Sequence, residues 1–237
     1  MSKILIETIN LKKTYQHFRG NITLFNNLNL KINQGDLVAL VGPSGSGKSS
    51  LLHLLALLDE PTKGDIKIND INTKKFSDKK KDETRRKNIS IIFQDNNLLN
   101  DFTAIENVMM PLIIKGKNMI SARKEAQTIL KAVKILERSH HFPNELSGGE
   151  QQRVAIARAL IAETNLILAD EPTGNLDFKT SKEIFSYFLK LKKLKKTIIF
   201  ATHNRELANR ADYKLSIFNG NITVSYTHLT LPTICSV

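Results

Sequence analysis

Hydrophobic residues along this chain fall into short, nearly continuous runs separated by longer segments with helical spacing. The short apolar runs have the length of strands buried on both faces of a parallel sheet; they are 37–41, 89–93, 166–169 and 197–201. Amphipathic spacing predicts helices at Ser50–Leu58, Ser121–Leu136, Gln151–Ala162 and Ser181–Leu194. This alternation predicts an α/β fold whose functional residues gather at the carboxyl ends of parallel strands.

Three further segments alternate apolar and polar residues, as half-buried strands do; they are Ile4–Leu11, Leu24–Ile32 and Asp65–Asn69. The block from about residue 95 to 162 is mostly helical by pattern and lies between two core strands, which predicts an inserted helical subdomain. Thr103 and Glu106 have the spacing of a capping box at the start of its first helix. We expect Pro111 to bend or interrupt that helix.

The strand at 37–41 leads into a glycine-rich loop that fits the pattern G-x-x-x-x-G-K-[ST] and is followed by a helix. In this context, backbone N–H groups and a helix N-terminus converge on phosphate oxygens. Lys48 would reach the β- and γ-phosphates, and the Ser49 hydroxyl would bind Mg²⁺. The sequence therefore predicts binding of a nucleoside triphosphate through Gly42, Pro43, Ser44, Gly45, Ser46, Gly47, Lys48, Ser49 and Ser50.

Polar residues follow three other apolar strands at the edge where parallel strands end. They are Gln94 after 89–93, Asp170 and Glu171 after 166–169, and His203 after 197–201. We predict that Asp170, Ser49 and Gln94 lie on the Mg²⁺ side, and that Glu171 orients or deprotonates a water beside the γ-phosphate. Gln94 and His203 would hydrogen-bond the water, the metal or the phosphate. Together these residues predict hydrolysis of the bound nucleotide.

A second glycine-rich turn precedes the helix at Gln151–Ala162. Ser147, Gly148 and Gly149 offer small side chains and exposed N–H groups ahead of a helix N-terminus, which is the character of an anion site, but they carry no lysine. One chain thus holds two half-sites. The sequence therefore predicts a head-to-tail homodimer, in which this turn closes on the partner's nucleotide and joins the two half-sites.

From residue 4 to 223 the chain resembles the ATP-binding cassette (ABC) ATPases. The resemblance lies in motifs that occur in the family's order: Gly42–Ser49, Gln94, the signature Leu146–Arg153, Ala169–Pro172, Gly174–Asp177 and His203. It implies a P-loop NTPase core with an N-terminal antiparallel β subdomain and an inserted α-helical subdomain. It also implies ATP and Mg²⁺ as ligands, Tyr15 stacked on adenine, Asp177 acting across the dimer interface, and Glu171 as the catalytic base. By the residues alone, Tyr15 is equally a surface aromatic.

A narrower resemblance, to the ATPases of lipoprotein-releasing transporters, lies in Leu51–Leu55, Leu58–Thr62 and Asn97–Leu112. It implies a subunit that couples ATP hydrolysis to an integral-membrane permease at the cytoplasmic face of the bacterial inner membrane, associated with the membrane through that permease. The chain departs from the group at Asn96 and Asn97, where two histidines are usual, and at Ser50, where threonine is usual. The apolar segment Val108–Ile114 would form either the groove for the permease or plain subdomain core.

Other functions stay open on the sequence. The same cassette serves exporters of peptides or macrolides and complexes that signal to cell-wall enzymes. The net charge of +12 suits an anionic partner such as nucleic acid or a membrane face, or else a solvated lysine-rich surface. ABC ATPases that act on nucleic acid usually carry two cassettes or a long coiled coil, and this chain shows neither, so no nucleic acid is expected.

The chain shows no membrane-span or export signal, and it has a single cysteine. No apolar run approaches the ~18 residues of a membrane span, no secretory signal is seen, and Cys235 alone fits a reducing cytosol. Residues 224–237 read like an in-frame translation of a sequencing-library transposon adapter. We hypothesise that they are not native and expect a single ATP-binding domain spanning residues 1–223.

Overall fold

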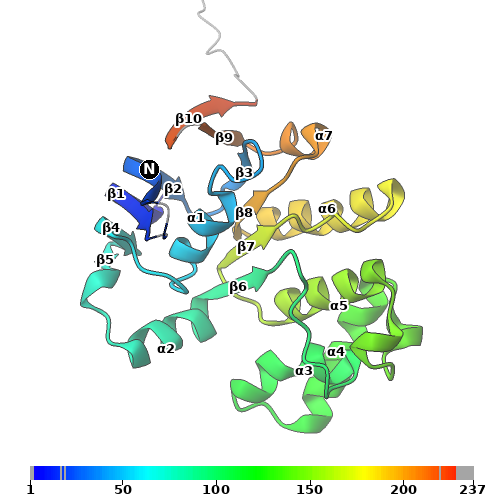
Figure 1. Ribbon diagram of the computed structural model, residues 1–237. Coiled ribbons are helices and arrows are strands. Elements are labelled where there is room, and N and C mark those ends of the chain that lie inside the picture. Colours follow the sequence, from blue (N-terminus) through cyan, green and yellow to red (C-terminus); the bar gives the residue numbers. More distant parts are fainter. Residues whose placement is uncertain (1–2, 17, 19, 219, 228–237) are drawn as a thin grey trace, which may run out of the picture.

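A computed structural model describes residues 3–16, 18, 20–218 and 220–227, and it contains two sheets (Figure 1). The larger sheet has the strand order β10-β9-β3-β8-β7-β6. Its strands are β3 (Leu37–Val41), β6 (Ile89–Ile92), β7 (Leu166–Asp170), β8 (Thr197–Ala201), β9 (Tyr213–Phe218) and β10 (Asn221–Tyr226). All neighbours pair in parallel except β10 and β9. The predicted α/β fold with a parallel core is therefore confirmed.

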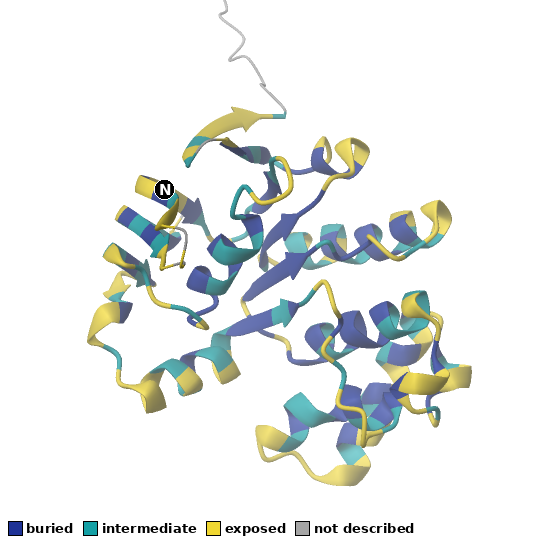
Figure 2. Cartoon of the chain, in the orientation of Figure 1, coloured by how far each residue is buried: buried dark blue, intermediate teal, exposed yellow. Residues whose placement is uncertain are grey.

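The larger sheet is buried on both faces, as its apolar runs predict. Alternate residues of β3 enter different hydrophobic cores: Leu37 and Ala39 face one core, while Val38 and Leu40 face the other. All four are fully buried (Figure 2). Because successive side chains of a strand point to opposite faces, a run of apolar residues without polar interruption is stable only with a layer on each side.

One of these layers is the smaller sheet, which is antiparallel and has the order β2-β1-β4-β5. Its strands are β1 (Ile4–Tyr15), β2 (Ile22–Asn33), β4 (Lys63–Ile68) and β5 (Ile71–Asn72). Leucines of α1 (Lys48–Leu55) pack with Phe25 and Ile6 of this sheet in the second core. A short 3-10 turn (Thr73–Lys75) and the charged helix α2 (Asp78–Asn88) then lead to β6.

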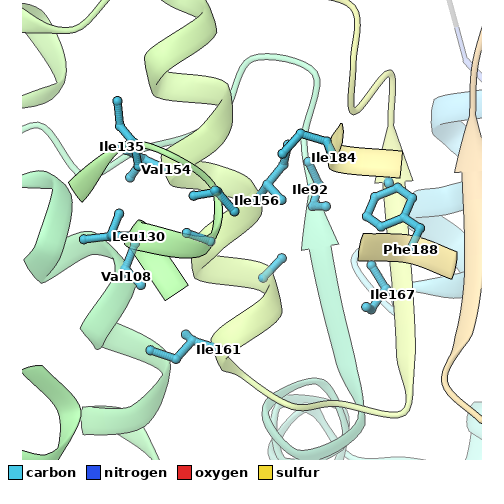
Figure 3. Close-up of a cluster of buried hydrophobic side chains, with 14 of the residues drawn as sticks. Ile92, Val108, Leu130, Ile135, Val154, Ile156, Ile161, Ile167, Ile184 and Phe188 are labelled. Carbon is cyan, nitrogen blue, oxygen red and sulfur yellow. The ribbon is translucent and has the colours of Figure 1, made fainter. Parts of the chain in front are cut away.

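The other layer consists of helices on the opposite face of the larger sheet. They are α3 (Ala104–Ile114), α4 (Met119–Ala132), α5 (Gly148–Ile161), α6 (Phe178–Lys193) and the short α7 (Arg205–Ala208), with 3-10 turns at Leu136–Arg138 and Pro143–Glu145. Val108, Leu130 and Val154 pack together, and their core continues to Ile92 and Ile167 of the sheet (Figure 3). None of the helices in the described part of the chain is long and apolar enough to cross a bilayer.

The start of α3 agrees with its sequence signal, but Pro111 does not interrupt the helix. The Thr103 N–H donates to Glu106 Oε2 at 2.8 Å in a capping box. Pro111 lies inside α3, which continues to Ile114. The buried Asn107 side chain accepts from the Leu99 N–H and donates to the backbone oxygens of Leu99, Phe102 and Thr103. These contacts fix the helix despite the missing N–H of Pro111.

Two other boundaries differ from the expectations. The helix α4 ends at Ala132, not Leu136, since Lys134 adopts a left-handed backbone conformation (φ 59°). The last strand passes the expected boundary after Thr223, because Val224, Ser225 and Tyr226 pair with β9. Residues 228–237 lie outside the described residues, so the idea that the tail is not native stays a hypothesis.

A glycine in β4 gives a test of this packing. A Cβ atom on Gly64 (φ 84°) would lie 2.3 Å from the backbone oxygen of Asn10 in β1. Gly116 has nearly the same φ of 87°, but a Cβ atom there would meet nothing within 4 Å. We expect Gly64→Ala to lower the free energy of unfolding in urea by about 1–3 kcal/mol more than Gly116→Ala. Equal losses would contradict this close approach of β1 and β4.

Candidate functional site

Four adjacent parallel strands, in the order β3-β8-β7-β6, bring the predicted site residues to one edge of the larger sheet. Leu40 of β3 is aligned with Ala201 of β8, which is aligned with Asp170 of β7. Ile92 at the end of β6 is aligned with Ala169. The glycine-rich loop, His203, Glu171 and Gln94 therefore leave the sheet at the same end, as expected for parallel strands.

Close packing explains the glycine that ends the loop. Gly47 is the N-cap of α1 with φ 99°, and a Cβ atom there would lie 2.8 Å from the ring of Phe25 in β2. A larger residue would meet both backbone strain and a steric clash. The antiparallel sheet is thus in direct contact with the start of α1. This contact fixes the position of the glycine-rich loop at the helix N-terminus.

The loop contains the donors that a phosphate group needs. Lys48 is buried, and its ammonium donates to the carbonyl oxygens of Gly42 (2.9 Å) and Pro43 (3.1 Å) in its own loop. The buried Ser46 Oγ has no hydrogen-bond partner among the described residues. A buried polar atom of this kind is costly unless it is satisfied. A phosphate that binds in the loop would accept from both groups, so the residues present fit a nucleotide.

Glu171 has an unusual backbone and a buried carboxylate. Its φ is 46°, and its N–H donates to the Ala201 oxygen at 3.1 Å across the strand ends. Its Oε1 is buried without a hydrogen bond and lies 3.4 Å from Nε2 of His203, while Oε2 accepts from the His203 N–H at 3.4 Å. Burial raises the pKa of Glu171, against the opposing charge effects of His203 and Lys48. A carboxylate with a raised pKa is suited to exchange a proton near neutral pH.

The three residues predicted on the Mg²⁺ side lie at or near the ends of β7, α1 and β6. Asp170 is buried at the end of β7, and Ser49 is half-buried in the first turn of α1, as is Ser50. No group of three or more His, Cys, Asp or Glu side chains in the described chain is arranged to hold a metal ion. This fits Mg²⁺, which binds through few protein oxygens together with phosphates and water. Gln94 lies just beyond β6 with an exposed side chain.

Tyr15 lies at the end of β1, and its side chain is partly exposed. Its hydroxyl donates to Asp59 Oδ2 at 2.8 Å, and the ammonium of Lys13 lies 4.6 Å from the centre of its ring. These two neighbours were missed from the sequence. The only signal for Asp59 was its place in the segment Leu58–Thr62, which the narrower resemblance includes.

The second glycine-rich turn is built around a helix start. Ser147 is the N-cap of α5, its Oγ accepts from the Glu150 N–H at 3.3 Å, and Glu150 Oε2 accepts from the Ser147 N–H at 2.8 Å. Ser147 and Gly148 are exposed, and a Cβ atom on Gly148 would meet nothing within 4 Å. The exposed N–H groups of this turn therefore point to a surface that a second molecule can reach.

The segment before α6 packs against that turn. A Cβ atom on Gly149 would lie 3.1 Å from the Asn175 oxygen. Two residues later, Asp177 is the N-cap of α6, and its carboxylate accepts from the Thr180 N–H (3.0 Å) and hydroxyl (2.5 Å). These hydrogen bonds lower the pKa of Asp177, the Thr180 hydroxyl first among them. Asp177 is thus an exposed anion beside the Ser147 turn.

The two glycine-rich turns lie on different sides of the larger sheet. The leucines of α1 belong to one hydrophobic core, whereas the buried residues of α5 belong to the other. Figure 1 shows α3, α4 and α5 grouped away from α1. One chain therefore brings together Lys48, Asp170, Glu171 and His203, but it does not bring the Ser147 turn to its own glycine-rich loop.

Comparison with known proteins agrees with these features. The family described as ABC transporter matches residues 25–174. The lipoprotein-releasing system ATP-binding protein LolD of Rickettsia bellii (strain RML369-C) is 46% identical over 228 residues, which cover 95% of this chain and 100% of the relative. LolD of Legionella pneumophila (strain Lens) is 40% identical over 223 residues, which cover 94% and 98%.

A solved structure also matches the fold of this chain closely. It is the dimeric ATP-binding cassette MJ0796 in a post-hydrolysis state, bound to ADP and Pi. It superposes with a TM-score of 0.91 at 37% identity and covers 94% of this chain and 99% of that chain. This chain therefore belongs to the ABC transporter family, in which it is an ATP-binding subunit and an ATPase close to LolD.

Proposed function

We propose that two copies of this chain hydrolyse ATP in a head-to-tail dimer and drive a membrane permease that releases lipoproteins at the cytoplasmic face of the bacterial inner membrane. The observation that supports hydrolysis most directly is the buried Glu171 carboxylate at the same sheet edge as Lys48 and His203. The cargo rests on the relatives, which are named as lipoprotein-releasing ATP-binding proteins.

In this proposal each residue at the sheet edge has a separate role in ATP binding or hydrolysis. Lys48 and the N–H groups of the loop hold the β- and γ-phosphates, and Ser49, Asp170 and Gln94 would hold Mg²⁺. The metal, when bound, would supply positive charge that offsets the charge of the phosphates. Glu171 accepts a proton from the attacking water, and His203 hydrogen-bonds the carboxylate or the γ-phosphate.

Glu171→Gln tests the base. The amide keeps the size of the side chain but cannot accept the proton, so we expect ATP to bind with nearly unchanged affinity while turnover falls by about 10²-fold or more. ATP should then hold the variant as a dimer, which size-exclusion chromatography with light scattering would detect. Normal turnover by the variant would refute the base assignment.

The dimer follows from the separation of the two half-sites. Gly148 and Gly149 offer N–H groups to an anion at the start of α5, beside the Ser147 hydroxyl, and no lysine accompanies them. Since α5 packs on the opposite side of the sheet from α1, a partner's loop is the natural source of the triphosphate. Asp177, exposed beside this turn, would then act across the interface. The solved relative is itself dimeric.

Ser147→Arg tests the shared site. The larger cation at the exposed turn should block closure, so ATP still binds but hydrolysis is lost. Lys48→Ala should also be inactive, because its glycine-rich loop no longer holds the β- and γ-phosphates. Mixed together, the two variants form dimers with one intact site, and we expect up to roughly a quarter of the normal ATPase rate to return. Full activity of Ser147→Arg alone, or no recovery in the mixture, would contradict the arrangement.

A groove beside the site is the proposed surface for the permease. It has a volume of about 350 Å³ and lies between α2, β6, α3 and α5. Pro111 and Ile114 supply apolar side chains from α3, and Arg85 and Arg86 line it from α2. Ile114 is 56% exposed, and together with Pro111 it gives the groove an apolar surface that a partner segment can cover.

The groove is also in contact with the loop that carries Gln94. The Arg158 guanidinium in α5 donates to the oxygens of Asn96 and Asn97 at 2.7 Å each, and burial lowers the pKa of Arg158. Both asparagines have left-handed backbones, with φ of 59° and 46°. A permease segment in the groove would therefore touch the loop that carries Gln94. This supports the coupling of transport to the nucleotide site.

Ile114→Asp tests the groove, with Ile120→Asp as its matched control. Ile120 is more exposed, at 84%, but does not line the groove. We expect Ile114→Asp to abolish co-purification of the permease from membranes, while the ATPase rate of the isolated chain stays normal. Ile120→Asp should retain the permease. Equal recovery with both variants would remove the groove from the proposal, and mass spectrometry of the captured permease would test the lipoprotein-releasing system.

A further inference from the structure

We propose that Asp59, together with Lys13, is a positioning residue that holds the Tyr15 ring in place for the adenine base. The inference rests on the proposed stacking of adenine on Tyr15 and adds the residues that orient the platform. Neither residue is expected to touch the nucleotide. Asp59 would act through the Tyr15 hydroxyl, and Lys13 would act through the Asp59 carboxylate and the face of the ring.

Two short hydrogen bonds connect these side chains, and a third ties Lys13 to the backbone. Asp59 Oδ2 accepts from the Tyr15 hydroxyl at 2.8 Å, and Oδ1 accepts from the Lys13 ammonium at 2.6 Å. Lys13 donates also to the backbone oxygen of Glu60 at 2.8 Å. Lys13 is 8% exposed, so this ion pair is more shielded from water than the surface pairs on α2. Charged hydrogen bonds of this length, partly removed from solvent, fix side-chain orientation.

The Asp59 carboxylate is stabilised in its charged form. Burial alone would raise its pKa, but the hydrogen bonds from Lys13 and Tyr15 outweigh burial, and the pKa lies below its ordinary value. The acceptor for the Tyr15 hydroxyl is therefore ionised at neutral pH. The hydrogen bond from the Tyr15 hydroxyl to Asp59 is therefore charge-assisted.

Lys13 also covers one face of the Tyr15 ring, with its ammonium 4.6 Å from the ring centre. That distance is within the range of a cation–π interaction. Since the side chain of Tyr15 remains 38% exposed, the ring still offers surface to a ligand. A flat base can then stack on the face that Lys13 does not cover, and the ring does not need to be ordered at the moment of binding.

The position of Asp59 in the chain connects the Tyr15 platform to the phosphate loop. The helix α1 begins at Lys48, in the phosphate loop, and ends at Leu55, shortly before Asp59. The Leu58 N–H donates to the His53 oxygen and Leu57 has a left-handed φ of 59°, so the turn that presents Asp59 is fastened to the end of α1. One helix thus sets the distance between the phosphate cradle and the anchor of the base platform.

Tyr15→Phe is the sharpest test, because it removes only the hydroxyl. We expect the Kd for ATP to rise about two- to tenfold, the range that one net hydrogen bond gives. The Kd for inorganic tripolyphosphate, which has no base, should not change. Asp59→Asn should weaken ATP binding by a similar factor, and the double variant should be no weaker than the weaker single variant, as expected for residues that act as a unit.

Glu60→Gln is the matched control. Glu60 is adjacent to Asp59 in the same turn, but its carboxylate pairs with Lys81 and not with Tyr15. We expect this variant to bind ATP and tripolyphosphate like the parent. If Glu60→Gln weakens ATP as much as Asp59→Asn, the effect is one of charge in the turn, and the proposal is overturned. Thermal unfolding of each variant would confirm that the compared proteins are folded.

Two outcomes separate this inference from the proposed stacking. If Tyr15→Ala leaves the Kd for ATP unchanged, adenine does not stack on Tyr15, and both ideas are wrong. If Tyr15→Ala weakens ATP binding but Tyr15→Phe and Asp59→Asn bind ATP as tightly as the parent, stacking stands and the positioning role of Asp59 is refuted. Loss of tripolyphosphate binding in Tyr15→Phe would also overturn the proposal, because the change would then reach the phosphate loop.

Discussion

Burial of one parallel sheet on both faces is the constraint on which the rest of this structure depends. Apart from Thr197 at the start of β8 and Asp170 at the end of β7, the strands β3, β7 and β8 are apolar and buried, so each face of the sheet needs its own covering layer. The antiparallel sheet and α1 cover one face, and the helices from α3 to α6 cover the other. The nucleotide-binding loop and the Ser147 turn are thereby assigned to different layers, with the catalytic strand ends between them.

This arrangement also explains why the strand ends hold strained or costly groups. Glu171 has a left-handed backbone and a buried carboxylate oxygen without a hydrogen bond, and each of these features is unfavourable by itself. The strand β7 cannot shift to relieve them, because its register is fixed by β6 and β8 through fully buried side chains. The buried sheet supplies the stability, and the carboxyl ends of its strands retain Glu171, whose pKa is raised.

Much of this architecture could be predicted from the sequence. Strands β3 and β8 have the predicted bounds, since short apolar runs allow few alternatives. Pro111 was misjudged because an apolar α3 is held by its neighbours, and the contacts of Asn107 cannot be seen in a local pattern. The phosphate loop and the strand-end residues were predicted because each lies in a motif or directly after a strand. Asp59 and Arg158 were missed because their partners are distant in sequence: Asp59 meets Tyr15 in β1, and Arg158 meets Asn96 and Asn97.

The same separation of layers bears on how hydrolysis would be controlled. A single copy has the loop, Glu171 and His203 assembled at one edge, yet the N–H groups at the start of α5 face away from that loop on the other layer. If the second anion site is needed for turnover, ATP bound by one copy remains intact until a partner's Ser147 turn arrives. The groove is lined in part by α5, the helix that begins at that turn, and Arg158 of α5 binds the loop after β6. A permease segment in the groove of one copy would therefore act on the Ser147 turn that this copy supplies to its partner's nucleotide, which is a physical route from membrane to nucleotide.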